Sequence, residues 1–173
     1  MTIDLDNLSP NRRTLLAGGI AITAVAIGGT ALAWQRGAPQ PSNEHFEITR
    51  TDAEWRRTLT PMQYYVLRQE GTERPFSHPL NNEHRRGTFS CAACALPLFS
   101  STTKYDSGTG WPSFYAPLRN AVGTSTDHRL GYARTEVHCR RCGGHLGHVF
   151  DDGPRPTGKR YCMNGAALVF AAG

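Results

Sequence analysis

Five cysteines and a pair of histidines hold most of the chemistry that this sequence could carry out. Four of the cysteines form two Cys-x-x-Cys pairs, Cys91 with Cys94 and Cys139 with Cys142. A Cys-x-x-Cys turn lets two thiolates converge on one ion, and two such turns complete a tetrahedral sulfur cage that suits zinc. We therefore predict one structural Zn²⁺ site, closed to water, that ties two distant segments of the chain together.

Other uses of these residues remain open from the sequence. Iron could take the place of zinc. An exported protein could instead form two disulfides, although disulfides within adjacent Cys-x-x-Cys pairs stabilise a fold poorly. A different cage around one ion could be formed by Cys139, Cys142, His145 and His148. Their short spacings would cramp that cage, and the first cysteine pair would have no role.

The remaining cysteine, Cys162, is a candidate nucleophile. A lone cysteine is most often an inert, buried side chain, but this one has reactive neighbours. Arg160 could lower the pKa of its thiol electrostatically, and His145 and His148 could supply or accept protons. Histidines three residues apart share a face only in a helix or a tight turn, and glycines at positions 143, 144 and 147 predict a loop there.

A glycine-rich turn at residues 106–114 (DSGTGWPSF) carries further candidate site residues. Pro112 would stiffen the turn, and Trp111 and Phe114 could form the walls of a small apolar pocket. Taken alone, the same letters describe a turn with a packed aromatic side chain.

Turn-forming residues recur through the chain, with 18 glycines and 11 prolines, and only 39% of the residues are hydrophobic. This composition favours short strands over a helical bundle. Capping-box patterns at residues 51–54 and 60–63 predict two short helices before Gly71. We therefore predict a mainly β fold, an antiparallel assembly with short N-terminal helices. The expected strands are residues 87–91, 96–99, 133–139, 148–150 and 166–170.

The first 33 residues resemble a twin-arginine export signal. Residues 11–16 (NRRTLL) match the signature, a weakly hydrophobic run follows, and residues 31–33 (ALA) match a cleavage site. We expect a signal peptide at 1–33, a linker at 34–45 and one domain at 46–173, and therefore export to the periplasm. An uncleaved membrane anchor is the alternative, since a span needs about 20 apolar residues, but the Gly and Ala content favours a signal.

The net charge of +5 does not indicate a nucleic-acid-binding surface. Lysine and arginine are scattered among acidic residues, which is typical of ordinary solubility rather than of a basic stripe. We therefore expect no nucleic-acid partner, and contact with a membrane only through the export signal.

Together, these motifs resemble the B-type methionine-(R)-sulfoxide reductase family, from about Trp55 to Phe170. The matching stretches occur in the family's order: residues 72–76 (TERPF), 104–108 (KYDSG), 110–114 (GWPSF), 145–154 (HLGHVFDDGP) and 160–162 (RYC). The two Cys-x-x-Cys pairs also match those of the family's zinc-bearing members. The resemblance implies two antiparallel sheets with short helices. It also implies an enzyme that reduces the R epimer of methionine sulfoxide, in peptides or proteins, to methionine.

The resemblance further implies a role for each candidate site residue. The residues implied to act in catalysis are Cys162, His145, His148 and Asn164. Those implied to bind the substrate or tune the site are Trp111, Phe114, Arg160 and Asp151. The cysteine would attack the sulfoxide sulfur and become a sulfenic acid, while the histidines and the asparagine would hydrogen-bond or protonate the oxygen. The tryptophan would hold the ε-methyl group of the substrate, and the aspartate would orient the histidines.

The sequence departs from the family at the position of the resolving cysteine. Many relatives carry Ser-Gly-Cys-Gly-Trp, and this chain has Thr109 in place of that cysteine. With four cysteines assigned to the metal, no thiol remains to form a disulfide with Cys162. We therefore expect a monomeric one-cysteine enzyme whose sulfenic acid is reduced by an external thiol, such as a thioredoxin-like protein. Met163 and Gly165, where the family more often has isoleucine and serine, could change the shape of the pocket.

Two other functions fit parts of the pattern. A zinc-stabilised module could bind oxidised peptides through Trp111 without turnover, and it would release no methionine when given dithiothreitol. A zinc-ribbon nucleic-acid binder would need a basic stripe and a chain that stays in the cytosol, and the sequence favours neither.

Overall fold

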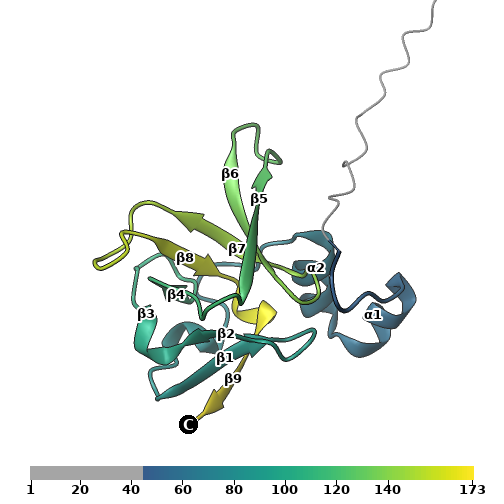
Figure 1. Ribbon diagram of the computed structural model, residues 1–173, viewed down its shortest axis with the longest axis horizontal. Helices are drawn as coiled ribbons and strands as arrows, with labels where there is room; N and C mark the ends of the chain where they lie inside the picture. The colour runs from purple at the N-terminus through teal and green to yellow at the C-terminus, as the bar shows by residue number, and fades with distance from the viewer. Residues whose placement is uncertain (1–44) are drawn as a thin grey trace, which may run out of the picture. The chain divides into compact units, whose positions relative to one another are not determined.

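Two short helices open the part of the chain that this computed structural model describes, residues 45–173 (Figure 1). α1 (Asp52–Thr58) and α2 (Pro61–Gln69) each begin at a capping box, with Thr51 and Thr60 as the N-cap residues. In each box the threonine hydroxyl accepts a hydrogen bond from the backbone N–H three residues further on. These helices confirm the prediction made from the capping patterns.

Within the described residues, the rest of the fold is two antiparallel sheets. One has the strand order β2-β1-β9, and the other has the order β3-β4-β8-β7-β6-β5. The mainly β architecture predicted from the sequence is therefore confirmed. The strands are β1 (Gly87–Cys91), β2 (Pro97–Ser100), β3 (Lys104–Tyr105), β4 (Ser113–Phe114), β5 (Val122–Asp127), β6 (Arg134–Cys139), β7 (His145–Phe150), β8 (Arg160–Met163) and β9 (Leu168–Ala172), and the 3₁₀ helices are η1 (Pro79–Asn82), η2 (Ser101–Thr103) and η3 (Gly165–Ala167).

Two strands of the larger sheet differ from the predicted pattern. β5 is not predicted, because its residues are small or polar and show no alternation of hydrophobic side chains. β7 begins at His145, where the glycines predict a loop. The loop prediction holds for Gly143 and Gly144, which lie in the turn before β7. It is wrong from His145 onward, because Gly147 fills a place in the strand where only glycine fits. A Cβ atom on Gly147 would lie 2.1 Å from the backbone oxygen of Cys162 on the neighbouring strand.

The hydrophobic core is rich in phenylalanine and joins the two sheets. Phe99 of β2 stacks on Phe114 of β4 with ring centroids 4.4 Å apart, and Phe89 of β1 meets Phe114 edge-on at 5.0 Å. All three rings are fully buried. Trp55 and Leu67 bring the helices into the same core, and α2 packs against both β7 and η3. The strand that carries both candidate histidines is therefore backed by a helix.

No helix within residues 45–173 is both long enough and apolar enough to cross a membrane. The predicted signal peptide at 1–33 and nearly all of the predicted linker at 34–45 lie outside the described residues. Both stay predictions, as does the start of the domain at residue 46.

Candidate active site and metal centre

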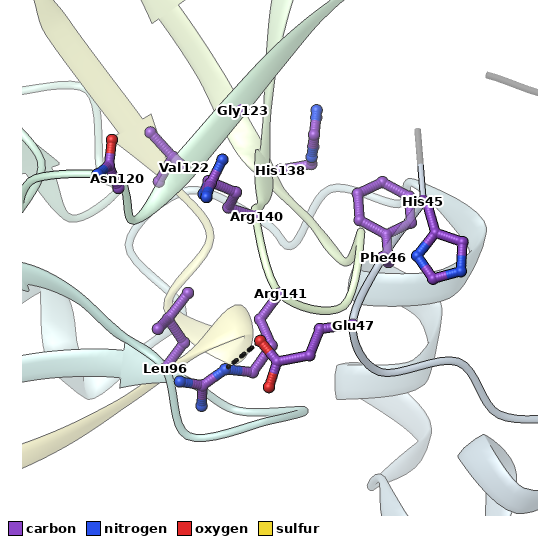
Figure 2. A pocket seen from close by; sticks show the side chains of 10 residues that line it. All are labelled: His45, Phe46, Glu47, Leu96, Asn120, Val122, Gly123, His138, Arg140 and Arg141. Atoms are coloured by element: carbon purple, nitrogen blue, oxygen red, sulfur yellow. Dashed lines mark ion pairs between the residues drawn. The ribbon is translucent and has the colours of Figure 1, made fainter. Parts of the chain in front are cut away.

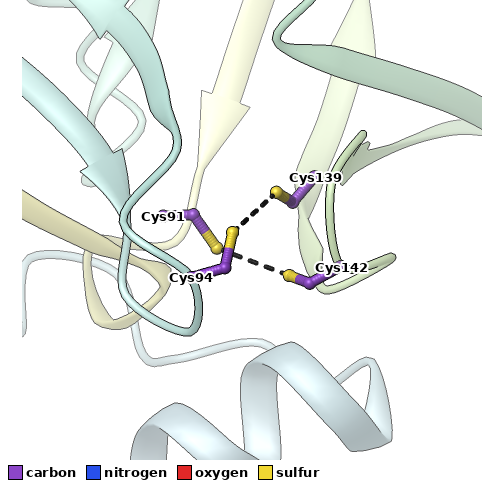
Figure 3. A group of neighbouring side chains, drawn as sticks. All are labelled: Cys91, Cys94, Cys139 and Cys142. Atoms are coloured by element: carbon purple, nitrogen blue, oxygen red, sulfur yellow. Dashed lines mark hydrogen bonds between the residues drawn. The ribbon is translucent and has the colours of Figure 1, made fainter. Parts of the chain in front are cut away.

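The four paired cysteines converge at one point between the sheets (Figure 3). All four Sγ atoms lie within 4.8 Å of one another. The separation is 3.8 Å between the sulfurs of Cys91 and Cys142 and 3.5 Å between those of Cys94 and Cys139. Sulfurs held about 2.3 Å from a tetrahedral ion would lie about 3.8 Å apart, whereas a disulfide needs about 2.05 Å. The spacing and the donor set therefore fit a metal ion, and all five cysteines are free thiols.

The two cysteine pairs are built in the same way. After Cys91 the N–H of Ala95 donates to its carbonyl at 2.8 Å, and after Cys139 the N–H of Gly143 does the same at 2.8 Å. Ala95 and Gly143 both have positive φ, 57° and 66°. One pair follows β1 of the small sheet and the other follows β6 of the large sheet. A metal ion here would join the two sheets, as the sequence predicts.

A single row of side chains crosses the six-stranded sheet. Its members lie opposite one another on β4, β8, β7, β6 and β5, and they are Ser113, Cys162, His148, Glu136 and Ser125. Partners in antiparallel register share a face of the sheet, so these five side chains lie on one face. Alternate residues on the same strands, such as Phe114 and Val137, belong to the core.

An irregularity in β7 brings the second histidine to the same face. Between two consecutive pairs with β6, the strand contains one extra residue, Leu146. Because of this β-bulge, His145 and His148 point to the same face of the sheet, although they are three residues apart in sequence. In a regular strand only residues two positions apart would do so. Their ring centroids lie 5.3 Å apart. The sequence predicts a helix or a tight turn for this pairing, and the structure achieves it with a bulged strand.

Each histidine is held by a carboxylate from another strand of the same sheet, β6 for His145 and β5 for His148. Glu136 lies 2.7 Å from Nδ1 of His145, and Asp127 lies 2.8 Å from Nε2 of His148. Arg134 donates to the same Asp127 oxygen at 2.5 Å. Sequence reasoning misses these three charged residues. Alternation along β6 could have suggested that Arg134 and Glu136 share a face, but nothing in the polar sequence of β5 indicates its pairing partners.

Burial and hydrogen bonding act in opposite directions on these groups. Burial lowers the pKa of His148, and the hydrogen bond with Asp127 only partly offsets that effect. Burial raises the pKa of Asp127, but hydrogen bonds from a backbone N–H, His148 and Arg134 outweigh it and lower the pKa to about 2. The pKa of Glu136 is also lowered, because hydrogen bonds from His145 and a serine outweigh its burial. Both carboxylates are therefore ionised at neutral pH.

A pocket of about 110 Å³ opens on this face of the sheet. Among the residues predicted from the sequence, it brings together Trp111, His148, Cys162 and Asn164. The other lining residues are Thr72, Arg134, Gly147 and Phe150. A half-buried thiol thus shares a small pocket with an imidazole, a guanidinium and two aromatic rings. This arrangement suits a nucleophile acting on a small, partly apolar group that carries a polar atom.

Four predicted site residues do not line this pocket, and they are His145, Phe114, Asp151 and Arg160. His145 is buried beside His148. Phe114 is adjacent to Ser113 on β4, so it points to the opposite face and is fully buried among other phenylalanines. Asp151 is exposed and pairs with Lys159 rather than with a histidine. Its orienting role is performed instead by the two carboxylates on β5 and β6.

Arg160 lines a second pocket of about 410 Å³, together with Thr109 and Asp152, rather than the pocket of Cys162. Its guanidinium makes two hydrogen bonds of 2.8 Å to Asp152 and lies 4.3 Å from the centroid of the Phe150 ring. The hydrogen bonds with Asp152 raise its pKa, so it is a permanent positive charge. Because Arg160 precedes Cys162 by two residues on β8, the charge is on the same face as the thiol.

The side-chain amide of Asn164 is committed to the backbone. Its Nδ2 donates to the carbonyl of Leu146 at 3.0 Å, and its Oδ1 accepts from the N–H of Glu73 at 3.0 Å. Glu73 is itself buried, and its carboxylate accepts hydrogen bonds from the N–H groups of Gly165 and Ala166 at 2.5 and 2.9 Å. Its carbonyl accepts from the indole of Trp111 at 3.1 Å. Glu73 therefore links the tryptophan of the pocket to the segment that follows Cys162.

A larger pocket of about 520 Å³ contains none of the residues predicted for the active site (Figure 2). It is polar and includes an ion pair of 3.7 Å between Arg141 and Glu47. Its lining residues are His45, Phe46, Glu47, Leu96, Asn120, Val122, Gly123, His138, Arg140 and Arg141. With no thiol in its lining, it is not the candidate active site.

Comparison with known proteins identifies the family. Residues 59–172 match the SelR domain, and the chain belongs to this family. It is 54% identical over 127 residues to the peptide methionine sulfoxide reductase MsrB of Leptospira interrogans, covering 73% of this chain and 97% of that protein. It is 58% identical over 127 residues to the MsrB of Leifsonia xyli, covering 72% and 91%. The chloroplastic peptide methionine sulfoxide reductase B1 of Arabidopsis thaliana is 45% identical over 154 residues, covering 88% and 76%.

Removing the metal ion should destabilise the domain. A ligand that binds only the folded state adds about 4 kcal/mol to the free energy of unfolding when present at 1,000 times its Kd. We expect chelator-treated protein to lose about this amount in urea unfolding, with metal content measured in parallel by elemental analysis. The Cys162→Ser variant should keep its full metal content. Equal stability of metal-loaded and metal-free protein would contradict the assignment.

Replacing Glu73 should weaken both the fold and the pocket. In Glu73→Gln, the amide can accept only one of the two backbone hydrogen bonds, and its NH₂ group faces a backbone N–H. We expect the free energy of unfolding to fall by about 1–3 kcal/mol, measured by urea denaturation. As a control, Glu70→Gln removes an exposed ion pair with Arg129 and should change stability by less than about 1 kcal/mol. Equal effects of the two substitutions would refute the role given to Glu73.

Proposed function

We propose that this protein reduces the R epimer of methionine sulfoxide, in peptides or proteins, to methionine. The observation that carries the proposal is the common pocket of Cys162, His148 and Trp111. A sulfoxide has the matching chemistry: an electrophilic sulfur, a strongly polarised oxygen and an apolar methyl group. The relatives are named as peptide methionine sulfoxide reductases, which supports the reduction of methionine sulfoxide in this proposal.

The first half of the reaction transfers one oxygen atom. The thiolate of Cys162 attacks the sulfoxide sulfur while the oxygen receives a proton, and the oxygen then moves to Cys162 as methionine departs. The sulfoxide is reduced by two electrons to methionine, and the thiol is oxidised by two electrons to a sulfenic acid. The pair His145 and His148 supplies the proton in this proposal. Asn164 contributes by fixing the backbone around the pocket, since its amide is already hydrogen-bonded.

Trp111 provides the apolar contact that distinguishes the epimers. Its indole N–H is committed to the carbonyl of Glu73, so the ring offers the substrate carbon atoms and no donor. With the methyl group on this ring and the sulfoxide oxygen toward His148, only one configuration at sulfur leaves the third substituent pointing outward. This supports selectivity for one epimer, and the family resemblance implies that it is the R epimer.

The second half of the reaction requires an external thiol. Thr109 has its hydroxyl 3.8 Å from the sulfur of Cys162, at the place where a resolving cysteine would act. Two thiols of a reductant, such as a thioredoxin-like protein, therefore reduce the sulfenic acid to a thiol, forming one disulfide and one water. We propose a one-cysteine enzyme acting as a monomer.

Zinc is the ion that we propose for the cysteine cage, because four thiolates in tetrahedral spacing suit it best. Cys91, Cys94, Cys139 and Cys142 would hold one Zn²⁺ in a closed structural site. Such an ion supplies stability and no chemistry at the sulfoxide.

We also propose that the protein works in the periplasm after export by the twin-arginine route. This route carries folded proteins, so the cage could fill with zinc in the reducing cytosol before the chain meets an oxidising compartment. Support comes only from the sequence of residues 1–33. An uncleaved anchor remains the alternative.

The Cys162→Ser variant should lose activity without losing its fold. We expect wild-type protein with dithiothreitol to release methionine from peptides carrying the R sulfoxide and not from those carrying the S sulfoxide. The variant should be slower by more than about 1,000-fold, because a serine hydroxyl is a far weaker nucleophile. Chromatographic measurement of methionine tests both statements. Binding of the sulfoxide peptide by wild-type protein with no methionine released would instead indicate a binding module.

Restoring a cysteine at position 109 should change how the enzyme is regenerated. In Thr109→Cys, the new thiol would attack the sulfenic acid on Cys162 and form a disulfide with loss of water. We expect one turnover without reductant to consume two thiols and give a protein lighter by two hydrogens, measured by mass spectrometry. In the control Thr102→Cys the new thiol is at an exposed position in η2, and Cys162 should therefore remain a sulfenic acid. No disulfide in the first variant would refute the one-cysteine account.

A further inference from the structure

We propose that Asp127 and Arg134 are a pair of opposed positioning residues that set the proton state of His148. Asp127 holds the imidazole through Nε2, which leaves Nδ1 as the nitrogen available to the pocket. Arg134 donates to the same carboxylate oxygen, and its positive charge disfavours the protonated form of His148. This inference rests on the proposed function, in which His148 delivers a proton to the sulfoxide oxygen.

The geometry of the β5–β6 ribbon carries the inference. Asp127 and Arg134 are direct partners in the ladder, the last residue of β5 and the first of β6. One oxygen of Asp127, Oδ2, contacts both Nε2 of His148 at 2.8 Å and Nη2 of Arg134 at 2.5 Å. Its other oxygen accepts from the N–H of Arg129 at 2.8 Å. The carboxylate therefore has a fixed orientation, and its side chain is only 10% exposed.

The contact at Nε2 determines which form of His148 can act. A neutral imidazole that donates from Nε2 to Asp127 has an unprotonated Nδ1, which can only accept a hydrogen bond. A doubly protonated ring keeps its bond to Asp127 and has an Nδ1–H left to donate. The sulfoxide oxygen is an acceptor, so only the protonated ring can serve it. A carboxylate at Nε2 favours that ring because the two charges are opposite.

Charged or titratable groups from four strands face this imidazole. They are Asp127 on β5, Arg134 on β6, His145 on β7 and Cys162 on β8. Glu136, the register partner of His148, is engaged by His145. Burial is the largest influence and lowers the pKa of His148; Asp127 raises it, and Arg134 and His145 lower it. Removing the aspartate charge should therefore lower this pKa, and removing the arginine charge should raise it.

The sign of each change follows from the protonated form being the active one. Activity that needs protonated His148 is present below its pKa and is lost as the pH rises through it. In Asp127→Asn the alkaline loss of activity should move to lower pH, by about one unit or more for an opposite charge at this distance. In Arg134→Gln it should move to higher pH. A purely structural role would give no reason for shifts in opposite directions.

The test is a single turnover at saturating substrate, so that regeneration by the external thiol does not limit the rate. Enzyme is mixed with an R-sulfoxide peptide between pH 5 and 9 without reductant, quenched, and analysed for methionine. Glu83→Gln is the matched control, because Glu83 is also a largely buried carboxylate paired with an arginine, Arg85, and it should leave the profile unchanged. Metal content and urea unfolding establish that each variant is folded.

Profiles that shift in opposite directions for the two variants support the inference. Profiles that coincide with wild type, or that shift in the same direction, overturn it while leaving the proposed function in place. A wild-type protein that forms no methionine at any pH overturns the proposed function and this inference with it.

A second measurement does not depend on activity. Nitrogen-15 NMR of histidine ring nitrogens distinguishes the two neutral tautomers, and in the wild-type protein His148 should carry its proton on Nε2. Finding the proton on Nδ1 would overturn the inference even if Asp127→Asn failed to fold.

Discussion

The register of the six-stranded sheet is the constraint on which the site depends. Because β8 pairs with β7 so that Cys162 lies opposite His148, a thiol and an imidazole from two consecutive strands share one face. The same row continues to Glu136, the partner of the second histidine. A slip of one residue on β8 would send Cys162 into the core and bring a large hydrophobic side chain to the pocket.

Two features fix that register. On the hidden face, Phe114 and Met163 are fully buried, so sliding a strand would expose them to water. At the end of β6, the second cysteine pair is also the turn that leads into β7. A metal ion held there would therefore fix the point at which the histidine strand begins. In the proposed enzyme, such an ion would take no part in the reaction but would help to set the geometry of the active site.

Much of this arrangement can be read from the sequence, but not the features that depend on long-range pairing. The capping threonines and the two cysteine pairs follow from local spacing, whereas the grouping of Cys162, His148 and Trp111 is what the family resemblance implies. The bulge at Leu146 cannot be predicted locally, because it exists only relative to β6. Asp127 stays hidden because β5 is polar and shows no strand pattern. Glu136 lies on a predicted strand, but its pairing with His145 depends on the register between β6 and β7. Asp151 and Phe114 are misassigned since sequence proximity does not tell which face of the sheet a side chain occupies.

The central claim is that Cys162, on this face of the sheet, takes the oxygen from the substrate. The most direct measurement is mass spectrometry of the wild-type protein after one turnover with an R-sulfoxide peptide and no reductant. The account predicts one methionine formed per chain and a gain of one oxygen atom on the peptide that contains Cys162. Methionine formed with that peptide unchanged, or with the oxygen on one of the cage cysteines, would contradict it.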